Sequence, residues 1–175
     1  MDHSLRLLLS RDDIAAAVKR LAQELDQEYQ HRELVVVAVM KGAFIFLADL
    51  VRQMKTPLRR IELVQAASYG PETVSPGRVS ILKNVPREAI QGQDVVLVED
   101  IIDTGITTAT IIKHLCHYRP ASLEICALLD KPCRRQTEVN PRFVGFTIPD
   151  RFVVGYGLDL DQRYRQLPDI YVLDE

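Results

Sequence analysis

Apolar residues recur at steps of three and four along the first part of the chain. These positions are Ile14, Val18, Leu21, Ala22 and Leu25. Such steps bring side chains to one face of a helix. Ser10 lies just before the run, and Asp12 and Asp13 come next, which is typical of a helix start. The pattern therefore predicts an amphipathic helix that opens at Ser10 and closes at residues 31–33.

Continuous apolar runs follow, and they are typical of strands that are covered on both faces. Residues 34–40 (LVVVAVM) and 94–99 (DVVLVE) are the clearest, and each precedes a turn and a predicted helix, at residues 43–54 and 107–118. Further strands are predicted at residues 60–68, 77–83, 122–129, 142–148, 152–156 and 170–173. Apolar strands that alternate with helices up to about residue 130 predict a parallel α/β sheet.

The strands after residue 130 are short and have no helices between them. We expect them to form a small annex on the same domain, because 175 residues fit one domain and are few for two. The expected organisation is a single domain over residues 1–175, with a core at about residues 10–130 and a hood from residues 1–9 and 131–175. Residues 69–76 (YGPETVSP) are too many for a tight hairpin, so this loop is expected to have a functional role or to be mobile.

The charge balance disfavours nucleic acid as a partner. The chain has 22 Lys and Arg against 24 Asp and Glu, a formal net charge of −2, whereas nucleic-acid-binding proteins show a basic excess or a basic stripe. A membrane partner is not expected either, because the longest apolar run, at residues 44–51, contains Asp49 and is far below the roughly 20 residues that a spanning helix needs. The three cysteines form no CxxC pair and the first residues do not resemble a signal peptide, so we expect a reduced, cytoplasmic protein.

The segment with the clearest chemistry is residues 94–108. An apolar strand runs into Glu99 and Asp100, and a turn of sequence DTGITT follows at residues 103–108. Ligands of open α/β sheets bind at the carboxyl ends of strands, and the amides and hydroxyls at a helix N-terminus suit a phosphate. The adjacent carboxylates would repel a bare phosphate, so they suit sugar hydroxyls or Mg²⁺.

Spacing alone leaves other interpretations of this segment open. The run VVLVED at residues 95–100 is similar to the strand of a Walker B element, but the chain has no GxxxxGK[ST] loop, and it has no GxGxxG fingerprint either. The acids Glu99, Asp100 and Asp103 could also be solvated charges on an ordinary loop.

Residues 95–108 closely resemble the phosphoribosyl-pyrophosphate (PRPP) motif of the type I phosphoribosyltransferases. Other segments are similar to the hypoxanthine-guanine branch of that family. They are residues 39–44 (VMKGAF), 68–69 (SY), 128–132 (LLDKP), 144–150 (VGFTIPD) and 152–159 (FVVGYGLD), with Arg165 downstream. The resemblance covers residues 5–173 and implies an α/β fold, with a parallel twisted sheet flanked by helices and a small hood formed by the C-terminal segment and the N-terminus.

The resemblance implies a role for each residue of the acidic turn. Glu99 and Asp100 would hold the ribose 2′- and 3′-hydroxyls, directly or through Mg²⁺. Asp103 would be the catalytic general base, near N7 of a purine. The 5′-phosphate would be bound at Asp103, Thr104, Gly105, Ile106, Thr107 and Thr108. Ile106 departs from relatives that carry a polar or basic residue there, but its side chain can point away from the phosphate.

The same resemblance implies where pyrophosphate binds. The backbone of Lys41 and Gly42 would contact it, and in the family the peptide before this lysine can be cis. Arg165 would pair with its charge, and Asp159 would bind a Mg²⁺ on the pyrophosphate, beside the purine. The implied metal ligands are therefore Glu99, Asp100 and Asp159.

Residues on the purine side are also implied by the resemblance. Lys131 would donate to O6 of the purine, Phe152 would stack on its ring, and the backbone of Val153 would read its edge. Ser68 and Tyr69 would begin a mobile lid, which would keep water from the reacting ribose.

The implied reaction joins a 6-oxopurine to PRPP and gives a nucleoside 5′-monophosphate and pyrophosphate. A lysine that faces O6 selects against adenine, because a 6-amino group would leave both donors unpaired. We expect hypoxanthine (product IMP) as the best substrate, guanine (product GMP) as the second and xanthine as the weakest. Relatives form dimers and tetramers, so a homo-oligomer is expected.

Two alternative functions fit the sequence less well. A regulatory protein that binds RNA or DNA would want a basic face, which the net charge of −2 disfavours. A pyrimidine or amino-sugar-linked phosphoribosyltransferase could share the PRPP loop, but Lys131 and Phe152 favour a purine.

Overall fold

Helix α1 (Arg11–Glu28) starts where the sequence predicts it, in a computed structural model that describes residues 4–68 and 79–174. The Ser10 hydroxyl accepts a hydrogen bond from the Asp13 amide, and the Asp13 carboxylate accepts one from the Ser10 amide. The predicted apolar face is buried along its whole length. The helix ends at Glu28, before residues 31–33, because the chain turns through His31 with a φ of 64°.

The capping box at Ser10 is expected to contribute to the stability of the protein. Replacing Ser10 with alanine leaves the Asp13 amide without its acceptor, so the free energy of unfolding is expected to fall by about 1 kcal/mol. Urea denaturation of both proteins measures this, with Ser4→Ala as the control because Ser4 is exposed and lies outside the helix. Equal stability of Ser10→Ala and the parent protein would show that the cap contributes nothing.

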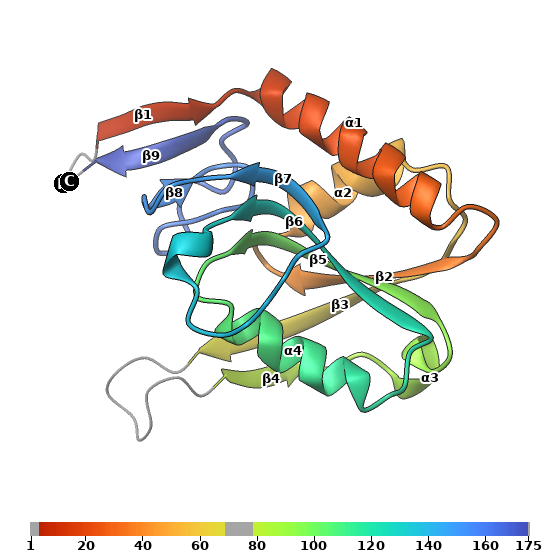
Figure 1. The fold of residues 1–175 in the computed structure, drawn as a ribbon. Coiled ribbons are helices and arrows are strands. Elements are labelled where there is room, and N and C mark those ends of the chain that lie inside the picture. Colours follow the sequence, from red (N-terminus) through yellow and green to blue (C-terminus); the bar gives the residue numbers. More distant parts are fainter. Residues whose placement is uncertain (1–3, 69–78, 175) are drawn as a thin grey trace.

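A six-stranded sheet forms the centre of the molecule (Figure 1). Its strands, in spatial order, are β4 (Val79–Lys83), β3 (Leu58–Ser68), β2 (Leu34–Met40), β5 (Asp94–Ile102), β6 (Ser122–Asp130) and β7 (Phe143–Thr147). All neighbours are parallel except β3 and β4. The predicted parallel α/β sheet is confirmed, and the bounds predicted for β2 are those of the structure.

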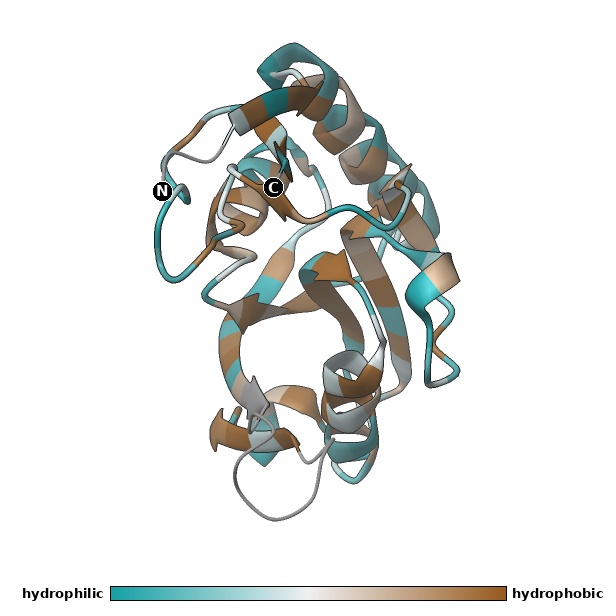
Figure 2. Ribbon diagram, turned by 90° about the vertical axis from the view of Figure 1, so that its left-hand side faces the viewer, coloured by the Kyte–Doolittle hydropathy of each residue, from teal (hydrophilic) through white to brown (hydrophobic). Residues whose placement is uncertain are grey.

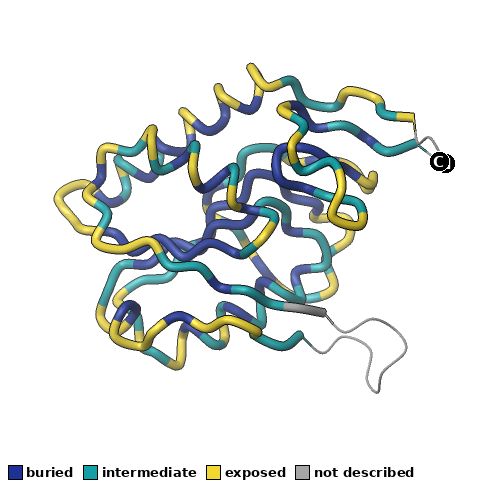
Figure 3. The backbone as a smooth tube through the Cα atoms, turned by 180° about the vertical axis from the view of Figure 1, so that it is seen from behind, coloured by how far each residue is buried: buried dark blue, intermediate teal, exposed yellow. Residues whose placement is uncertain are grey.

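Helices cover both faces of this sheet, which explains why β2 is apolar at every position and why the middle of β5 (residues 95–98) is continuously apolar. Helices α1 and α2 (Phe44–Gln53) pack on one face, against Val36 and Val96 among others. Helix α4 (Ile106–Cys116) and the short α3 (Arg87–Ile90) pack on the other, against Val35 and Val95 among others. Figure 2 shows many hydrophobic residues along the strands of the sheet, and Figure 3 shows that the buried residues are concentrated on the same strands. In the part of the chain that the structure describes, no helix has the length and apolar character needed to cross a membrane.

A second, three-stranded sheet lies beside the first and joins the two ends of the chain. It consists of β1 (Ser4–Leu9), β9 (Ile170–Asp174) and β8 (Val153–Val154), all antiparallel. We call these strands the hood sheet. They confirm that the N-terminus and the C-terminal segment form a hood, although the sequence did not predict β1 as a strand.

Two expectations for the C-terminal part were wrong. Strand β7 is not part of an annex but pairs in parallel with β6, because residues 131–142 are numerous enough to cross over without a regular helix. The strand expected at residues 152–156 is limited to β8, because Gly155, Tyr156 and Gly157 all have positive φ.

Candidate active site

Two adjoining cavities lie at the carboxyl-terminal edge of the six-stranded sheet. The loop cavity, of about 220 Å³, is lined by Val39, Met40, Gly42, Glu99, Asp100, Ile101, Asp103, Thr104, Gly105, Thr107 and Thr108. The lysine cavity, of about 190 Å³, is lined by Asp100, Ile101, Asp103, Lys131, Phe152, Val153, Leu158 and Asp159. They share Asp100, Ile101 and Asp103. The fold thus brings most of the predicted site residues together, from five separate segments of the chain.

The turn between β5 and α4 has the form that an anion site needs. Gly105 has a φ of 82°, and helix α4 begins at Ile106, whose amide donates to the Thr104 hydroxyl at 3.4 Å. The next two amides, of Thr107 and Thr108, have no acceptor in residues 4–68 or 79–174, so they are free to donate to a ligand. Ile106 does not line the loop cavity, as expected for a side chain that points away from a phosphate. Thr108 is buried, and its hydroxyl donates to Glu99 at 3.0 Å.

Strand β5 continues to Ile102, so Glu99 and Asp100 lie inside the strand, near its carboxyl end, and not in the loop after it. Burial raises the pKa of the Glu99 carboxyl well above its usual range, and the Asp100 carboxylate raises it further. Burial also raises the pKa of Asp100 to about 6, against a lowering by backbone amides and by Arg165. Two adjacent carboxyls that resist ionisation together are suited to a cation or to sugar hydroxyls.

The raised pKa of Glu99 predicts how stability depends on pH. The unfolded glutamate loses its proton near pH 4.3, whereas the folded one keeps it to a higher pH, so the free energy of unfolding falls as pH rises through this window. Glutamine cannot titrate and still accepts the Thr108 hydrogen bond. We expect Glu99→Gln to be increasingly more stable than the parent protein between pH 4 and pH 7.

Urea denaturation across this pH range measures the difference for Glu99→Gln, with the exposed Glu138→Gln as the control. A difference from the parent protein that does not change with pH would contradict the buried, proton-retaining state of Glu99.

Gly42 is enclosed between two neighbours. A β-carbon there would lie 2.5 Å from Cγ of Asp100, and one on Gly157 (φ 98°) would overlap the carbonyl oxygen of Gly42. The Met40–Lys41 peptide is cis, one of the two conformations that the resemblance left open. Gly42 lines the loop cavity, whereas the Lys41 side chain is exposed, does not line it and donates to Gln162 at 3.3 Å.

Arg165 contacts Gly157, the glycine that packs against Gly42. Its Nη1 donates to the carbonyl oxygen of Gly157 at 2.6 Å. Its Nη2 is 2.7 Å from Oδ1 of Asp159, while its buried Nε has no partner among the described residues. A buried N–H of a cation without an acceptor favours an anionic ligand. Arg165 itself does not line either cavity.

The three implied metal ligands do not form one cluster, since the described residues contain no group of three or more His, Cys, Asp or Glu arranged to hold a metal. Asp100 and Asp159 line the lysine cavity, and Glu99 lines the loop cavity. Asp159 also raises the pKa of Asp100, so the two carboxylates are within electrostatic reach. One or two carboxylates completed by substrate phosphates are what Mg²⁺ usually takes, so these residues fit it.

On the purine side, Lys131 is 5% exposed and its Nζ lies 3.7 Å from Oδ2 of Asp103. Phe152 is 51% exposed at the same cavity, and Val153 is held there by the pairing of β8 with β9. Of the two residues that the resemblance implies begin a lid, Ser68 is the last residue of β3, and Tyr69 lies outside the described residues.

Two arginines to which the sequence analysis assigned no role, Arg134 and Arg135, contact the site. Arg134 Nε is 2.9 Å from Oδ1 of Asp103, and Arg135 Nη1 donates to the Asp103 carbonyl oxygen at 2.7 Å. They follow Lys131 through a short 3₁₀ turn, Pro132–Arg134. Neither periodicity nor any motif indicated these contacts, because the turn alone brings the two side chains back to Asp103.

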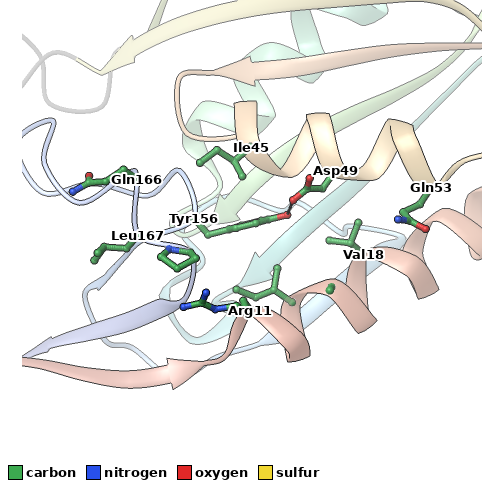
Figure 4. A pocket seen from close by; sticks show the side chains of 11 residues that line it. Arg11, Val18, Ile45, Asp49, Gln53, Tyr156, Gln166 and Leu167 are labelled. Atoms are coloured by element: carbon green, nitrogen blue, oxygen red, sulfur yellow. Dashed lines mark hydrogen bonds between the residues drawn. The ribbon is translucent and has the colours of Figure 1, made fainter.

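A cavity of about 450 Å³ lies elsewhere, between α1, α2 and residues 166–168 (Figure 4). The Tyr156 hydroxyl donates to Asp49 there at 2.6 Å, and Arg11 pairs with Asp169 at 3.0 Å. Its charged groups are thus already partnered, and none of the predicted site residues lines it. The candidate active site is the pair of smaller cavities.

Comparison with known proteins agrees with this geometry. The phosphoribosyl transferase domain family matches residues 8–161. A hypoxanthine-guanine phosphoribosyltransferase of Aquifex aeolicus is 44% identical over 98% of this chain and 96% of its own. A hypoxanthine phosphoribosyltransferase of Salmonella typhimurium is 42% identical over 100% of both chains. A crystal structure of a Bacillus anthracis hypoxanthine-guanine phosphoribosyltransferase, with a HEPES molecule in its active site, has a TM-score of 0.91 at 40% identity and covers 98% of this chain and 100% of that one.

Proposed function

Because the chain belongs to the phosphoribosyltransferase family, among the hypoxanthine and hypoxanthine-guanine phosphoribosyltransferases, we propose that it transfers the 5-phosphoribosyl group of PRPP to hypoxanthine, and less efficiently to guanine. The products are IMP or GMP and pyrophosphate, which makes this a purine salvage reaction. The observation that carries the proposal is the pair of adjoining cavities. One joins free helix amides to two carboxyls, and the other joins a buried lysine to an exposed aromatic ring.

Asp103 has the central position in the proposed mechanism, since it lines both cavities. A phosphate held by the loop would place the ribose over Glu99 and Asp100, and C1 of the ribose would then point toward the lysine cavity. From there the Asp103 carboxylate takes the proton from N7 as the other imidazole nitrogen attacks C1. This transfer keeps the purine from becoming cationic as the new bond forms.

The leaving pyrophosphate gains negative charge as its bond to C1 breaks. Arg165 lines neither cavity, but its positive charge lowers the pKa of Asp100 and so is within electrostatic reach of the site, which supports a role in stabilising that charge together with the backbone amide of Gly42. Asp100 and Asp159 would hold Mg²⁺, which supplies further positive charge to the pyrophosphate when bound.

Lys131 supports the choice of a 6-oxopurine. Its ammonium is buried and carries donors only, so beside its ion pair with Asp103 it can donate to O6 of hypoxanthine or guanine, whereas the amino group of adenine offers it no acceptor. Phe152 offers an exposed ring on which a flat base can stack.

A substrate panel with PRPP and Mg²⁺ tests the proposal. We expect kcat/KM to fall in the order hypoxanthine, guanine, xanthine, with adenine inactive. The highest kcat/KM with adenine, with xanthine or with a pyrimidine would contradict the assigned substrate. Affinity for bulk RNA that collapses as salt rises, without any transfer activity, would favour the regulatory alternative.

The proposal also includes a cytoplasmic homo-oligomer, a dimer or a tetramer. Large apolar side chains on α2 and β3 support it, since Phe44 and Ile61 remain 42% and 47% exposed. Light scattering coupled to gel filtration measures the mass directly, and a monomer at micromolar concentration would contradict this part of the proposal.

A further inference from the structure

The phosphate loop is held from outside by the segment that follows β6. The carbonyl oxygen of Asp103 accepts a hydrogen bond from Nη1 of Arg135 at 2.7 Å. The next carbonyl oxygen, that of Thr104, accepts from the amides of Gln136 at 2.9 Å and Thr137 at 3.3 Å. Two consecutive carbonyls of the loop are thus turned toward residues 135–137.

Turning these carbonyls outward turns the following amides inward. In a planar trans peptide, the C=O and the N–H point in opposite directions, and both peptide units are trans. The amides of Thr104 and Gly105 therefore point away from residues 135–137. They donate to no group in residues 4–68 or 79–174, and both residues line the loop cavity. Successive amides that face one concavity form an anion site.

Arg135 is itself fixed by a buried partner. Its Nη2 donates to Oδ1 of Asp130, and the two side chains are only 15% and 12% exposed. Asp130 is the last residue of β6 and pairs with Ile102 of β5 and Thr147 of β7, so the anchor belongs to the rigid sheet. The absence of a side chain at Gly105 lets Arg135 approach, since a β-carbon there would lie 2.9 Å from Cδ of Arg135.

We propose that Arg135, anchored by Asp130, is a positioning residue for phosphate recognition: it holds the Asp103–Thr104 peptide in the orientation that aims the Thr104 amide at the 5′-phosphate. The proposal rests on the proposed function, because it assumes a phosphorylated ligand in the loop cavity. Arg135 acts through the backbone and does not touch the phosphate. Its neighbour Arg134 has a different contact, with the side chain of Asp103.

The test measures how much the phosphate of a ligand contributes to binding. Calorimetry gives the dissociation constants of IMP and of inosine, which lacks the phosphate, and their ratio isolates the phosphate contribution. In Arg135→Met we expect the ratio of inosine Kd to IMP Kd to fall about tenfold, because the Thr104 amide is no longer held toward the phosphate and one hydrogen bond to it is lost. The Kd of inosine is expected to stay within about twofold of its parent value, because the purine contacts are retained.

Arg142→Met is the matched control, since Arg142 pairs with Glu28 and Glu124 and lines neither cavity. An unchanged ratio in Arg135→Met overturns the inference, and so does an equal loss of affinity for IMP and inosine, which would mean general damage to the site. If Arg135→Met does not fold, Asp130→Asn decides in its place: a lowered ratio supports the inference, and an unchanged ratio overturns it.

Binding measurements on the parent protein distinguish a failure of this inference from a failure of the proposed function. If it binds neither IMP nor PRPP, the proposed function fails and the inference fails with it. If it prefers IMP to inosine and Arg135→Met has the same preference, the inference alone fails.

Discussion

Replacing Gly42 with alanine is expected to lower kcat/KM by about a hundredfold or more, because a misplacement of about 1 Å in an active site can cost that much. The new β-carbon would lie 2.5 Å from Cγ of Asp100 and closer still to its carboxylate oxygen. Either Asp100 leaves its position or the loop of residues 40–43 moves away from the loop cavity. Each of these shifts separates groups that the proposed reaction uses together.

Steady-state kinetics with hypoxanthine and PRPP measures the effect of Gly42→Ala. Gly92→Ala is the control, since a β-carbon on Gly92 has no heavy atom within 4 Å and Gly92 lines neither cavity, although alanine at its φ of 69° costs some stability. Activity of Gly42→Ala close to that of the parent protein would mean that the packing of Gly42 on Asp100 is not required for catalysis.

The second large effect is expected from Asp103→Asn, which should lower kcat by about 10²- to 10⁴-fold, the usual contribution of a positioned general base. An amide keeps the size of the side chain but cannot take a proton. Lys131 and Arg134 lie 3.7 Å and 2.9 Å from the carboxylate oxygens, so the position of the side chain is well defined. The affinity for PRPP is expected to persist, because in the proposed binding mode backbone amides hold the phosphate.

Calorimetry of PRPP binding and single-turnover kinetics separate these two effects in Asp103→Asn. The exposed Asp12→Asn, on the first turn of α1, is the matched control. Unchanged turnover in Asp103→Asn would remove Asp103 from the role of base.

The central sheet could be predicted from the sequence because its signals are local. Strand β2 is an uninterrupted apolar run, and α1 combines a capping box with apolar steps of three and four. Strand β1 has no such signal. It pairs with β9, so its register joins Ser4 to Asp174, and only the folded chain brings these ends together. The place of β7 in the main sheet likewise depends on a crossover that no local pattern marks.

The residues of the candidate site also differ in whether a local sequence signal marks them. Residues of the acidic turn, together with Lys131, Phe152 and Asp159, could be named from motifs, and the fold places them around two shared cavities. The contacts of Arg135 with Asp103 and Asp130 could not, because they depend on a short 3₁₀ turn that reverses the chain. The state of Glu99 was also out of reach, since its raised pKa comes from complete burial in the folded protein.

A crystal structure of the protein with IMP tests the central claim most directly. The account predicts the 5′-phosphate in the loop cavity, within hydrogen-bond distance of the Thr104 and Gly105 amides, and the purine in the lysine cavity, with O6 at Lys131 and its ring against Phe152. IMP bound elsewhere, for example in the cavity between α1 and α2, or bound with its phosphate at Lys131, would contradict the account.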